Sequence, residues 1–326
     1  MFIPFVATIN AMKNDFAWMA GYIDGDGCFY TGTTFQPSKN IFVYEAHLQV
    51  GTVEEINLIP FRSYGGAVRC HPAQENRLPF YVWTLKDIDA FASDVLPYLT
   101  EKREDCLSVQ RLRRSIRESN YQKVDEQTKQ FRLELIQAAR ENRMSEWLTE
   151  ERLAALKKVE KAIVPSEIDF IYLAGFIEAE GCFRIKRWMP KGKPNPVYCI
   201  TLEVSNARAT IFDFLLPRFG GSISGYRTRS TGTLMGRWTL SAAELTEILP
   251  TLHSCLRFRK KDVCAKLIEF SNTILPNGGD RHSEAFKRQM NEILAHRERL
   301  VAEIHALNKK GSHQVPSGCH GPSGGL

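Results

Sequence analysis

The sequence lacks any apolar run that approaches the roughly 18 residues a membrane-spanning helix needs. Its first residues, MFIPFVA, carry no basic region and are too short for a secretory signal. The 8 cysteines form no CxxC pair and no zinc-finger spacing, and none of the 8 histidines has the spacing of a metal ligand. These absences argue against a membrane protein, a secreted protein and a zinc finger. We expect an intracellular protein in a reduced compartment; the sequence leaves open whether its origin is organellar (mitochondrial or plastid) or bacterial.

What the sequence does contain is an internal repeat. The stretch MAGYIDGDGCF at 19–29 returns as LAGFIEAEGCF at 173–183, so that Gly27 and Gly181 lie 154 positions apart. Four further landmarks recur at offsets of 153 to 155: LQV and LEV, GGAV and GGSI, WTL twice, and LP twice. A chain of 326 residues is long enough for two cores, so the pattern predicts a duplicated domain.

Hydrophobic periodicity and turn residues predict the element order αββαββα in each copy. In the first copy we expect a helix from Asn14 or Asp15 to Asp26, a helix over 53–63, and strands near 28–35, 41–51, 66–71 and 79–85. In the second copy we expect a helix with a Ser166–Asp169 capping box, and strands near 182–188, 196–205, 221–227 and 234–240. The predicted domains are a first repeat (1–118), a charged helical linker (119–165), a second repeat that includes a C-terminal helix (166–310), and a disordered tail (311–326).

The glycines of the repeated motif serve something other than helix stability, because each costs a helix interior about 1 kcal/mol relative to alanine. Gly21 and Gly25, like Gly175 and Ala179, form a small face at i,i+4 that allows two backbones to approach closely. We expect the two motif helices to pack on these faces, at the interface between the repeats.

The acids of the motif also need an explanation, since a carboxylate meets the negative end of the helix dipole in a last turn. If the small faces pack together, Asp26 and Glu180 meet at the end of the seam. Two adjacent carboxylates repel each other, and a divalent cation relieves that repulsion. Mg²⁺ takes one or two carboxylates together with waters and substrate phosphates, which fits a phosphodiester substrate.

The two motifs together resemble the paired signature of the LAGLIDADG homing endonucleases, in their monomeric, two-motif form. The resemblance covers residues 14–272 in element order. It implies an α+β fold: two pseudo-twofold-related αββαββα repeats that form an antiparallel β saddle, with the motif helices at the central interface. It also implies a site-specific DNA endonuclease that breaks both strands of a long asymmetric target with Mg²⁺-activated water and leaves 3′ overhangs. Ca²⁺ is expected to support binding of the double-stranded DNA without cleavage.

The resemblance assigns roles to the motif acids. Asp26 and Glu180 fall on the position that binds the metal, so they are the expected catalytic acids. Asp24 and Glu178, at the sixth motif position, are expected to cap and orient neighbouring segments.

Further catalytic residues are implied after the second strand and after the third helix of each repeat. Thr52 and Asn206 fall where a polar side chain positions water, although Thr52 departs from the usual Gln or Asn. Lys102 is the basic residue of the first repeat, expected to contact the scissile phosphate or to shape the water pocket. In the second repeat the register points to Arg259, with Lys260 next to it.

The saddle implied by the resemblance would present alternate side chains of its strands to DNA. The expected DNA-binding residues are Tyr30, Thr34, Gln36, Glu45, His47, Gln49, Arg69 and His71 in the first repeat, and Arg184, Lys186, Trp188, Thr201, Glu203, Arg227, Arg229 and Arg237 in the second. The basic, proline-rich loop 187–196 is expected to follow phosphates.

Other functions remain possible on the same fold. A group I intron RNA maturase would bind its own intron RNA, with or without DNA cleavage, and would tolerate loss of the acids. A DNA-binding regulator with inactive sites would tolerate it too. Both acids are intact, which favours the enzyme. An intein is disfavoured, because the sequence has no N-terminal Cys or Ser and no C-terminal His-Asn pair.

Overall fold

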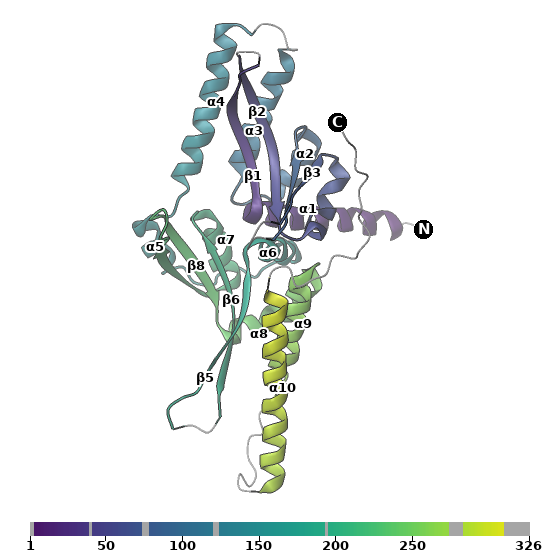
Figure 1. The fold of residues 1–326 in the computed structure, drawn as a ribbon, viewed down its shortest axis with the longest axis vertical. Helices are drawn as coiled ribbons and strands as arrows, with labels where there is room; N and C mark the ends of the chain where they lie inside the picture. Colours follow the sequence, from purple (N-terminus) through teal and green to yellow (C-terminus); the bar gives the residue numbers. More distant parts are fainter. Residues whose placement is uncertain are drawn as a thin grey trace.

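The computed structural model describes residues 3–38, 41–73, 78–119, 124–192, 195–273 and 283–309, and side chains from Met12 onward. Its architecture is α+β, with two four-stranded antiparallel sheets (Figure 1). The strand order is β1-β2-β4-β3 in the first sheet and β5-β6-β8-β7 in the second, so the two sheets have the same topology. The predicted fold class is therefore confirmed.

The first repeat contains the following elements: α1 (Ile3–Asp26), β1 (Gly27–Gln36), β2 (Ile41–Thr52), the 3₁₀ helix η1 (Glu55–Tyr64), β3 (Ala67–His71), β4 (Phe80–Leu85), α2 (Asp89–Val95), η2 (Leu96–Tyr98) and α3 (Arg103–Glu118). The second repeat contains α6 (Glu167–Glu180), β5 (Cys182–Trp188), β6 (Val197–Asn206), α7 (Thr210–Phe219), β7 (Ser222–Arg227), β8 (Leu234–Leu240), α8 (Ala242–Cys255), α9 (Arg259–Ser271) and α10 (Glu284–Asn308). Between them lie α4 (Glu126–Ser145) and α5 (Glu150–Leu156). The tail predicted to be disordered, 311–326, lies outside the described residues.

One sequence-based expectation about the first repeat is wrong, and a second is confirmed only as a helix of another type. Helix α1 begins at Ile3 rather than at Asn14 or Asp15. Pro4 fits the first turn of a helix, and no helix-breaking residue follows it before Asn14. The segment expected as a helix over 53–63 is a 3₁₀ helix, since Pro60 lies in its middle, where it has no N–H for the α-helical ladder. In the second repeat the corresponding element is the α-helix α7, whose Pro217 lies near the end.

The two sheets bury one face each. Phe29, Leu48, Val50 and Trp83 alternate with polar residues along the strands of the first sheet and are fully or almost fully buried. Phe183, Leu202, Val204 and Trp238 occupy the same positions in the second sheet. Because side chains alternate with a period of two, the opposite face of each sheet is polar. In Figure 1 helices α1 and α6 cross at the centre, between the first sheet above and the second sheet below.

No helix in the described part of the chain combines the length and apolar character needed to cross a membrane.

Candidate active site and nucleic-acid interface

Helices α1 and α6 touch backbone to backbone. A Cβ atom on Gly21 would lie 2.0 Å from the carbonyl oxygen of Tyr172, and one on Gly175 would lie 1.9 Å from that of Trp18. Both distances are too short for any side chain, so only glycine fits at these two crossings. One turn further along, a Cβ on Gly25 would lie 2.4 Å from the Cβ of Ala179. The structure thus brings all four small motif residues into the seam.

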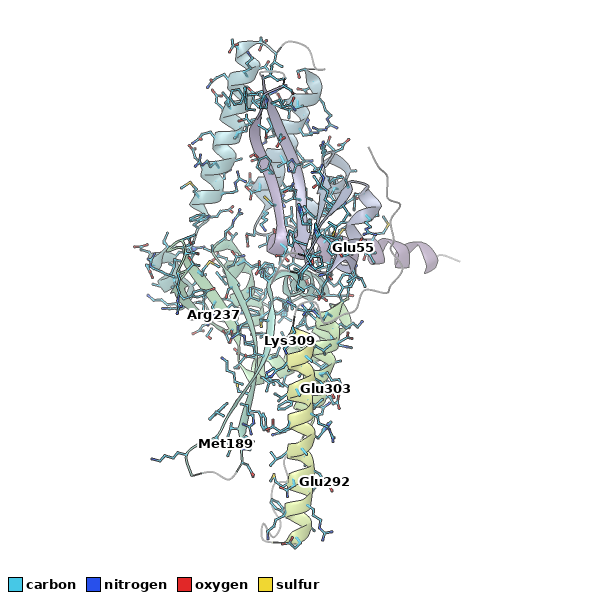
Figure 2. The ribbon with its side chains drawn as sticks, in the orientation of Figure 1. Glu55, Met189, Arg237, Glu292, Glu303 and Lys309 are labelled. Atoms are coloured by element: carbon cyan, nitrogen blue, oxygen red, sulfur yellow. The ribbon has the colours of Figure 1, made fainter. Side chains whose placement is uncertain are left out.

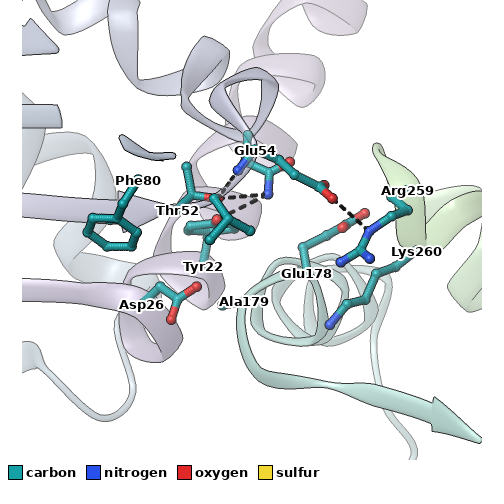
Figure 3. A pocket seen from close by; sticks show the side chains of 12 residues that line it. Tyr22, Asp26, Thr52, Glu54, Phe80, Glu178, Ala179, Arg259 and Lys260 are labelled. Atoms are coloured by element: carbon teal, nitrogen blue, oxygen red, sulfur yellow. Dashed lines mark hydrogen bonds and ion pairs between the residues drawn. The ribbon is translucent and has the colours of Figure 1, made fainter. Parts of the chain in front are cut away.

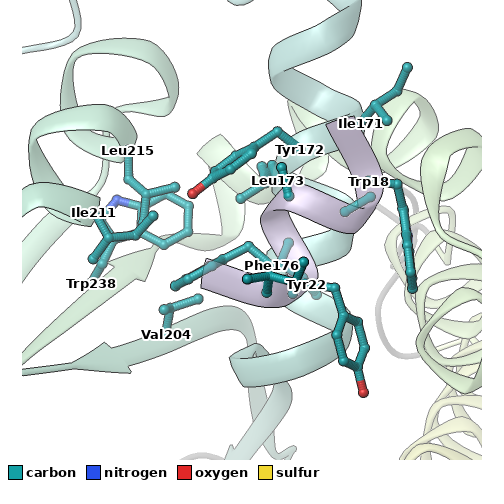
Figure 4. Close-up of a cluster of buried hydrophobic side chains, with 14 of the residues drawn as sticks. Trp18, Tyr22, Ile171, Tyr172, Leu173, Phe176, Val204, Ile211, Leu215 and Trp238 are labelled. Carbon is teal, nitrogen blue, oxygen red and sulfur yellow. The ribbon is translucent and has the colours of Figure 1, made fainter. Parts of the chain in front are cut away.

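Large side chains close the seam on both sides. Trp18, Tyr22, Tyr172 and Phe176 flank the glycines and are buried (Figure 4). The Tyr172 hydroxyl donates to the Asp24 carboxylate across the seam, at 2.6 Å. The two repeats are therefore held together by a continuous apolar interface that contains this buried hydrogen bond.

The two motif acids end the helices at the same end of the seam. Asp26 is the last residue of α1 and Glu180 is the last residue of α6, and both are exposed. A Cβ on Gly25 would lie 3.2 Å from the Cγ of Glu180, so Glu180 lies against the residue that precedes Asp26. In the described residues no group of three or more His, Cys, Asp or Glu side chains could hold a metal ion. Two carboxylates fit a hard cation such as Mg²⁺ or Ca²⁺, which takes its remaining ligands from water and phosphate.

The sixth-position acids are structural caps. Asp24 accepts hydrogen bonds from the backbone N–H groups of Thr100 (2.8 Å), Glu101 (3.0 Å) and Lys102 (2.8 Å), just before α3. Glu178 accepts from the N–H groups of Arg257 (3.2 Å) and Phe258 (2.9 Å), just before α9. Burial raises the pKa of Glu178, and these backbone donors oppose that shift. Each acid thus ties a motif helix to the positive end of the third helix of its own repeat.

A lysine closes the C-terminal end of each motif helix: Lys102, which is buried, and Lys260, which is partly buried. The Lys102 ammonium donates to the carbonyl oxygens of Ile23 (2.8 Å), Asp24 (2.7 Å) and Gly25 (3.1 Å). The Lys260 ammonium donates to the carbonyl oxygens of Ile177 (2.6 Å) and Gly181. These carbonyls lie at the negative end of each helix, where a cation is stabilising; that of Ile177 also accepts from the N–H of Gly181 (2.9 Å). Burial lowers the pKa of Lys260 to about 8.

Lys260, and not Arg259, is the counterpart of Lys102. Arg259 forms an ion pair with Glu54 (2.9 Å) and donates to the carbonyl oxygen of Leu307 (2.9 Å). Neighbouring helical residues point about 100° apart, so only one of the two can face the end of α6. Of the two alternatives, Lys260 therefore occupies the position equivalent to Lys102, and a catalytic role of Arg259, which also lines the cavity described next, stays a prediction.

A cavity of about 180 Å³ opens beside the first acid (Figure 3). Asp26 and Thr52 of the first repeat line it together with Glu178, Arg259 and Lys260 of the second. Both repeats therefore build this site, and the acid of one repeat shares it with the lysine of the other.

Thr52 and Asn206, at the ends of β2 and β6, each lie near the lysine of the other repeat. Thr52 is buried, and its hydroxyl accepts hydrogen bonds from Asn57 Nδ2 (3.3 Å) and from the N–H of Glu54 (3.1 Å). Asn206 donates through Nδ2 to the Glu101 carboxylate at 2.7 Å, next to Lys102. Thr52 thus lies near the lysine of the second repeat, and Asn206 lies near the lysine of the first.

Two buried ion pairs join the repeats at these positions with opposite polarity. Glu54, two residues after Thr52, pairs with Arg259, which directly precedes Lys260 (2.9 Å). Arg208, two residues after Asn206, pairs with Glu101, which directly precedes Lys102 (3.5 Å). All four side chains are at most 12% exposed.

Sequence analysis missed the role of these four charges. The available signal was that the residues two positions beyond Thr52 and Asn206, Glu54 and Arg208, have opposite charges. Burial raises the pKa of Glu101 to about 8, although the Lys102 and Arg208 charges oppose this shift.

Solved structures share this fold, whereas no protein-family model and no curated protein matches the sequence. I-SmaMI bound to an uncleaved DNA target in the presence of calcium ions superposes with a TM-score of 0.62 at 16% identity, covering 89% of this chain and 98% of that chain. I-SmaMI, a LAGLIDADG homing endonuclease, bound to cleaved DNA gives 0.60 at 17% identity, covering 90% and 97%. The LAGLIDADG meganuclease I-AabMI bound to uncleaved DNA gives 0.58 at 15% identity, covering 90% and 97%. The fold is that of the LAGLIDADG homing endonucleases.

In this LAGLIDADG fold, the polar face of the first sheet carries all the residues expected there. Strand register places Tyr30 opposite His47, and their rings stack at 4.9 Å. Burial lowers the pKa of His47. The same face holds Thr34, Gln36, Glu45, Gln49, Arg69 and His71.

The second LAGLIDADG sheet departs from expectation at two arginines. Arg184, Lys186, Trp188 and Arg237 share its polar face, and Figure 2 labels Arg237 on β8. Arg227 instead opposes Leu234 on the other face, because it is in phase with the buried Ile223, and it pairs with Glu150 of α5 (2.9 Å).

Arg229 is exposed in the turn after β7 and lies on no strand. Arg227 therefore lies in the expected strand but on its other face, and the expectation that Arg229 lies in a strand is wrong; contact of either arginine with DNA stays a prediction.

Thr201 and Glu203 lie on the polar face but are only 5% exposed. The Glu203 carboxylate pairs with Lys186 (3.1 Å) and Arg184 (3.3 Å), both about half exposed. Glu203 therefore supports the two basic side chains from beneath. Of the loop 187–196, residues 193–194 lie outside the described residues.

Proposed function

We propose that the protein is a site-specific DNA endonuclease that acts as a monomer and breaks both strands of a long, asymmetric target. The observation that carries this proposal is the composite site at the end of the α1–α6 seam. There two carboxylates, Asp26 and Glu180, are exposed at the ends of helices that Lys102 and Lys260 close, and each site takes side chains from both repeats. The structural neighbours bound to DNA support a double-stranded DNA partner.

Asp26 and Glu180 are the residues that would hold Mg²⁺. When bound, the cation would lower the pKa of a water and offset the charge of the scissile phosphate. Lys102 has three ammonium protons, and all three are engaged with carbonyl oxygens of α1. Its role is therefore to fix the end of the helix that carries Asp26, and not to contact phosphate. Lys260 would fix the end that carries Glu180 in the same way.

The polar faces of the two sheets would read DNA. The first face presents the stacked Tyr30–His47 pair, and the second presents Arg184 and Lys186 at its centre. Since the two faces carry different side chains, each half of the target would have its own sequence, and the whole target would be asymmetric.

The experiment is to recover cleaved ends from a randomised plasmid library incubated with the protein and Mg²⁺, with Ca²⁺ in a parallel reaction. We expect double-strand breaks with 3′ overhangs at one long sequence in Mg²⁺, and binding without cleavage in Ca²⁺. The Asp26→Asn, Glu180→Gln double variant should still bind that sequence in Ca²⁺ and cut neither strand in Mg²⁺. Full cleavage by the double variant would refute the mechanism.

A group I intron RNA maturase is the second candidate, since the same polar faces could bind intron RNA. Splicing of that RNA by the double variant, without DNA cleavage by the native chain, would favour it.

A further inference from the structure

The first repeat places polar groups where the second repeat has hydrocarbon. At the 154-residue offset Tyr22 corresponds to Phe176, and Asn57 corresponds to Ile211. Phe176 and Ile211 are fully buried in the core. Burial of a hydroxyl and an amide is unfavourable unless they are hydrogen-bonded, so packing alone does not explain Tyr22 and Asn57.

These polar groups gather around the one catalytic position that departs from the family pattern. Asn57 Nδ2 donates to the Thr52 hydroxyl and to the Tyr22 hydroxyl, both at 3.3 Å. Asn57 is 6% exposed, and its Oδ1 atom has no hydrogen-bond partner among the described residues. The three side chains line the same cavity as Asp26, and Figure 3 labels Tyr22, Thr52 and Asp26 around it.

The cavity has room for ordered water. A volume of about 180 Å³ compares with about 30 Å³ for each molecule of liquid water, so several waters fit. A buried amide oxygen needs a donor, and a water in this cavity would supply one. Such a water would be held by Asn57 on one side and would lie within the cavity that Asp26 lines.

We propose that Asn57 provides the amide that Thr52 is too short to provide, and that it orients water beside Asp26. Asn57 is thus a positioning residue for one of the two cleavage sites, while Asn206 has this role at the other site. The inference rests on the proposed endonuclease function and makes the two sites chemically different.

The test uses the full-length protein and a supercoiled plasmid that carries the recovered target, with each strand of a linear duplex labelled separately. Asn57→Leu keeps the volume of the side chain and removes its polar atoms. We expect it to slow cleavage of one strand at least tenfold, to leave the other strand unchanged, and to accumulate nicked circles. Affinity for the target in Ca²⁺ should stay within twofold of the native protein.

Strand identity makes the test specific. Asn206→Ala should slow the strand that Asn57→Leu leaves unaffected. Ile211→Val, at the corresponding position of the second repeat, is the matched control and should leave the ratio of the two strand rates unchanged. Adding Thr52→Asn to Asn57→Leu should restore part of the lost rate on the affected strand. If Asn57→Leu fails to fold, Asn57→Ser, which also lacks the amide, should show the same strand preference.

Equal slowing of both strands, slowing of the same strand by Asn57→Leu and Asn206→Ala, or unchanged rates would each overturn the role of Asn57. In all three cases the native protein still cuts, so the proposed function survives. A native protein that cuts no DNA would overturn both.

Discussion

Exchanging one methyl group across the seam tests how the two repeats are aligned. In Gly25→Ala the new Cβ would lie 2.4 Å from the Cβ of Ala179. Carbon atoms pack best at about 3.5–4.0 Å, so the helices must separate by roughly 1 Å at the end that carries the acids. Such overpacking costs about 1–3 kcal/mol, offset by the gain of about 1 kcal/mol in helix propensity. Cleavage should fall further than stability, because the displacement occurs next to Asp26 and Glu180.

Ala179→Gly in the same chain should rescue Gly25→Ala. The double variant moves the methyl group from α6 to α1, so the two helix propensities balance and the 2.4 Å contact disappears, while the 3.2 Å contact with Cγ of Glu180 remains. We expect a favourable coupling of about 1–3 kcal/mol in urea unfolding, and partial recovery of cleavage. Gly175→Ala is the control, since its Cβ would lie 1.9 Å from the backbone oxygen of Trp18 and no side-chain truncation relieves that clash. Gly25→Ala and Ala179→Gly effects that add within about 0.5 kcal/mol would show that this contact does not set the spacing of the helices.

The logarithm of DNA affinity should fall linearly with the logarithm of salt concentration, at about −0.9 per neutralised phosphate. Lys186→Ala should flatten that slope. Arg227→Ala should not, because Arg227 lies on the other face of the sheet and pairs with Glu150. Equal slopes for Lys186→Ala and the native protein in fluorescence-anisotropy titrations would exclude Lys186 from the interface. The free energy of unfolding should decrease between about pH 5 and pH 8, because a Glu101 pKa raised to about 8 means that the folded state binds more protons than the unfolded state in this window. Glu101→Gln should reduce that decrease by up to about 1 kcal/mol per pH unit in urea unfolding, and an unchanged pH profile would contradict the raised pKa. Lys102→Met should leave target binding in Ca²⁺ intact and abolish cleavage, because three carbonyl oxygens at the end of α1 lose their donor. Binding is measured by gel shift and cleavage on a plasmid, and cleavage that survives would show that this lysine does not position Asp26.

Local sequence patterns predict much of the fold. Alternation of apolar and polar residues gave the strands to within one or two residues, since each sheet has one buried face. The start of α1 escaped this reading, because the residues before Asn14 contain neither a capping signal nor a breaker after Pro4. The 3₁₀ geometry of η1 could have been anticipated from Pro60.

The site was less accessible to sequence reasoning, because its contacts join residues far apart in the chain. Arg208 and Glu101 are 107 positions apart, and their pairing depends on how the repeats are docked. Asn57 had no motif to mark it, and only its position beside Thr52 in the folded chain shows what it does. Arg259 and Lys260 could be distinguished only by the direction in which each side chain leaves α9.

The opposite polarity of the two ion pairs between the repeats determines which repeat can pair with which. A dimer of identical subunits uses every interface contact twice, so both of its ion pairs have the same orientation. Here a copy of the first repeat bound to another first repeat would bring Glu54 against Glu101, and two second repeats would bring Arg208 against Arg259. At these positions each repeat is therefore complementary only to the other, and a self-paired dimer of either repeat would require a change in a buried charge.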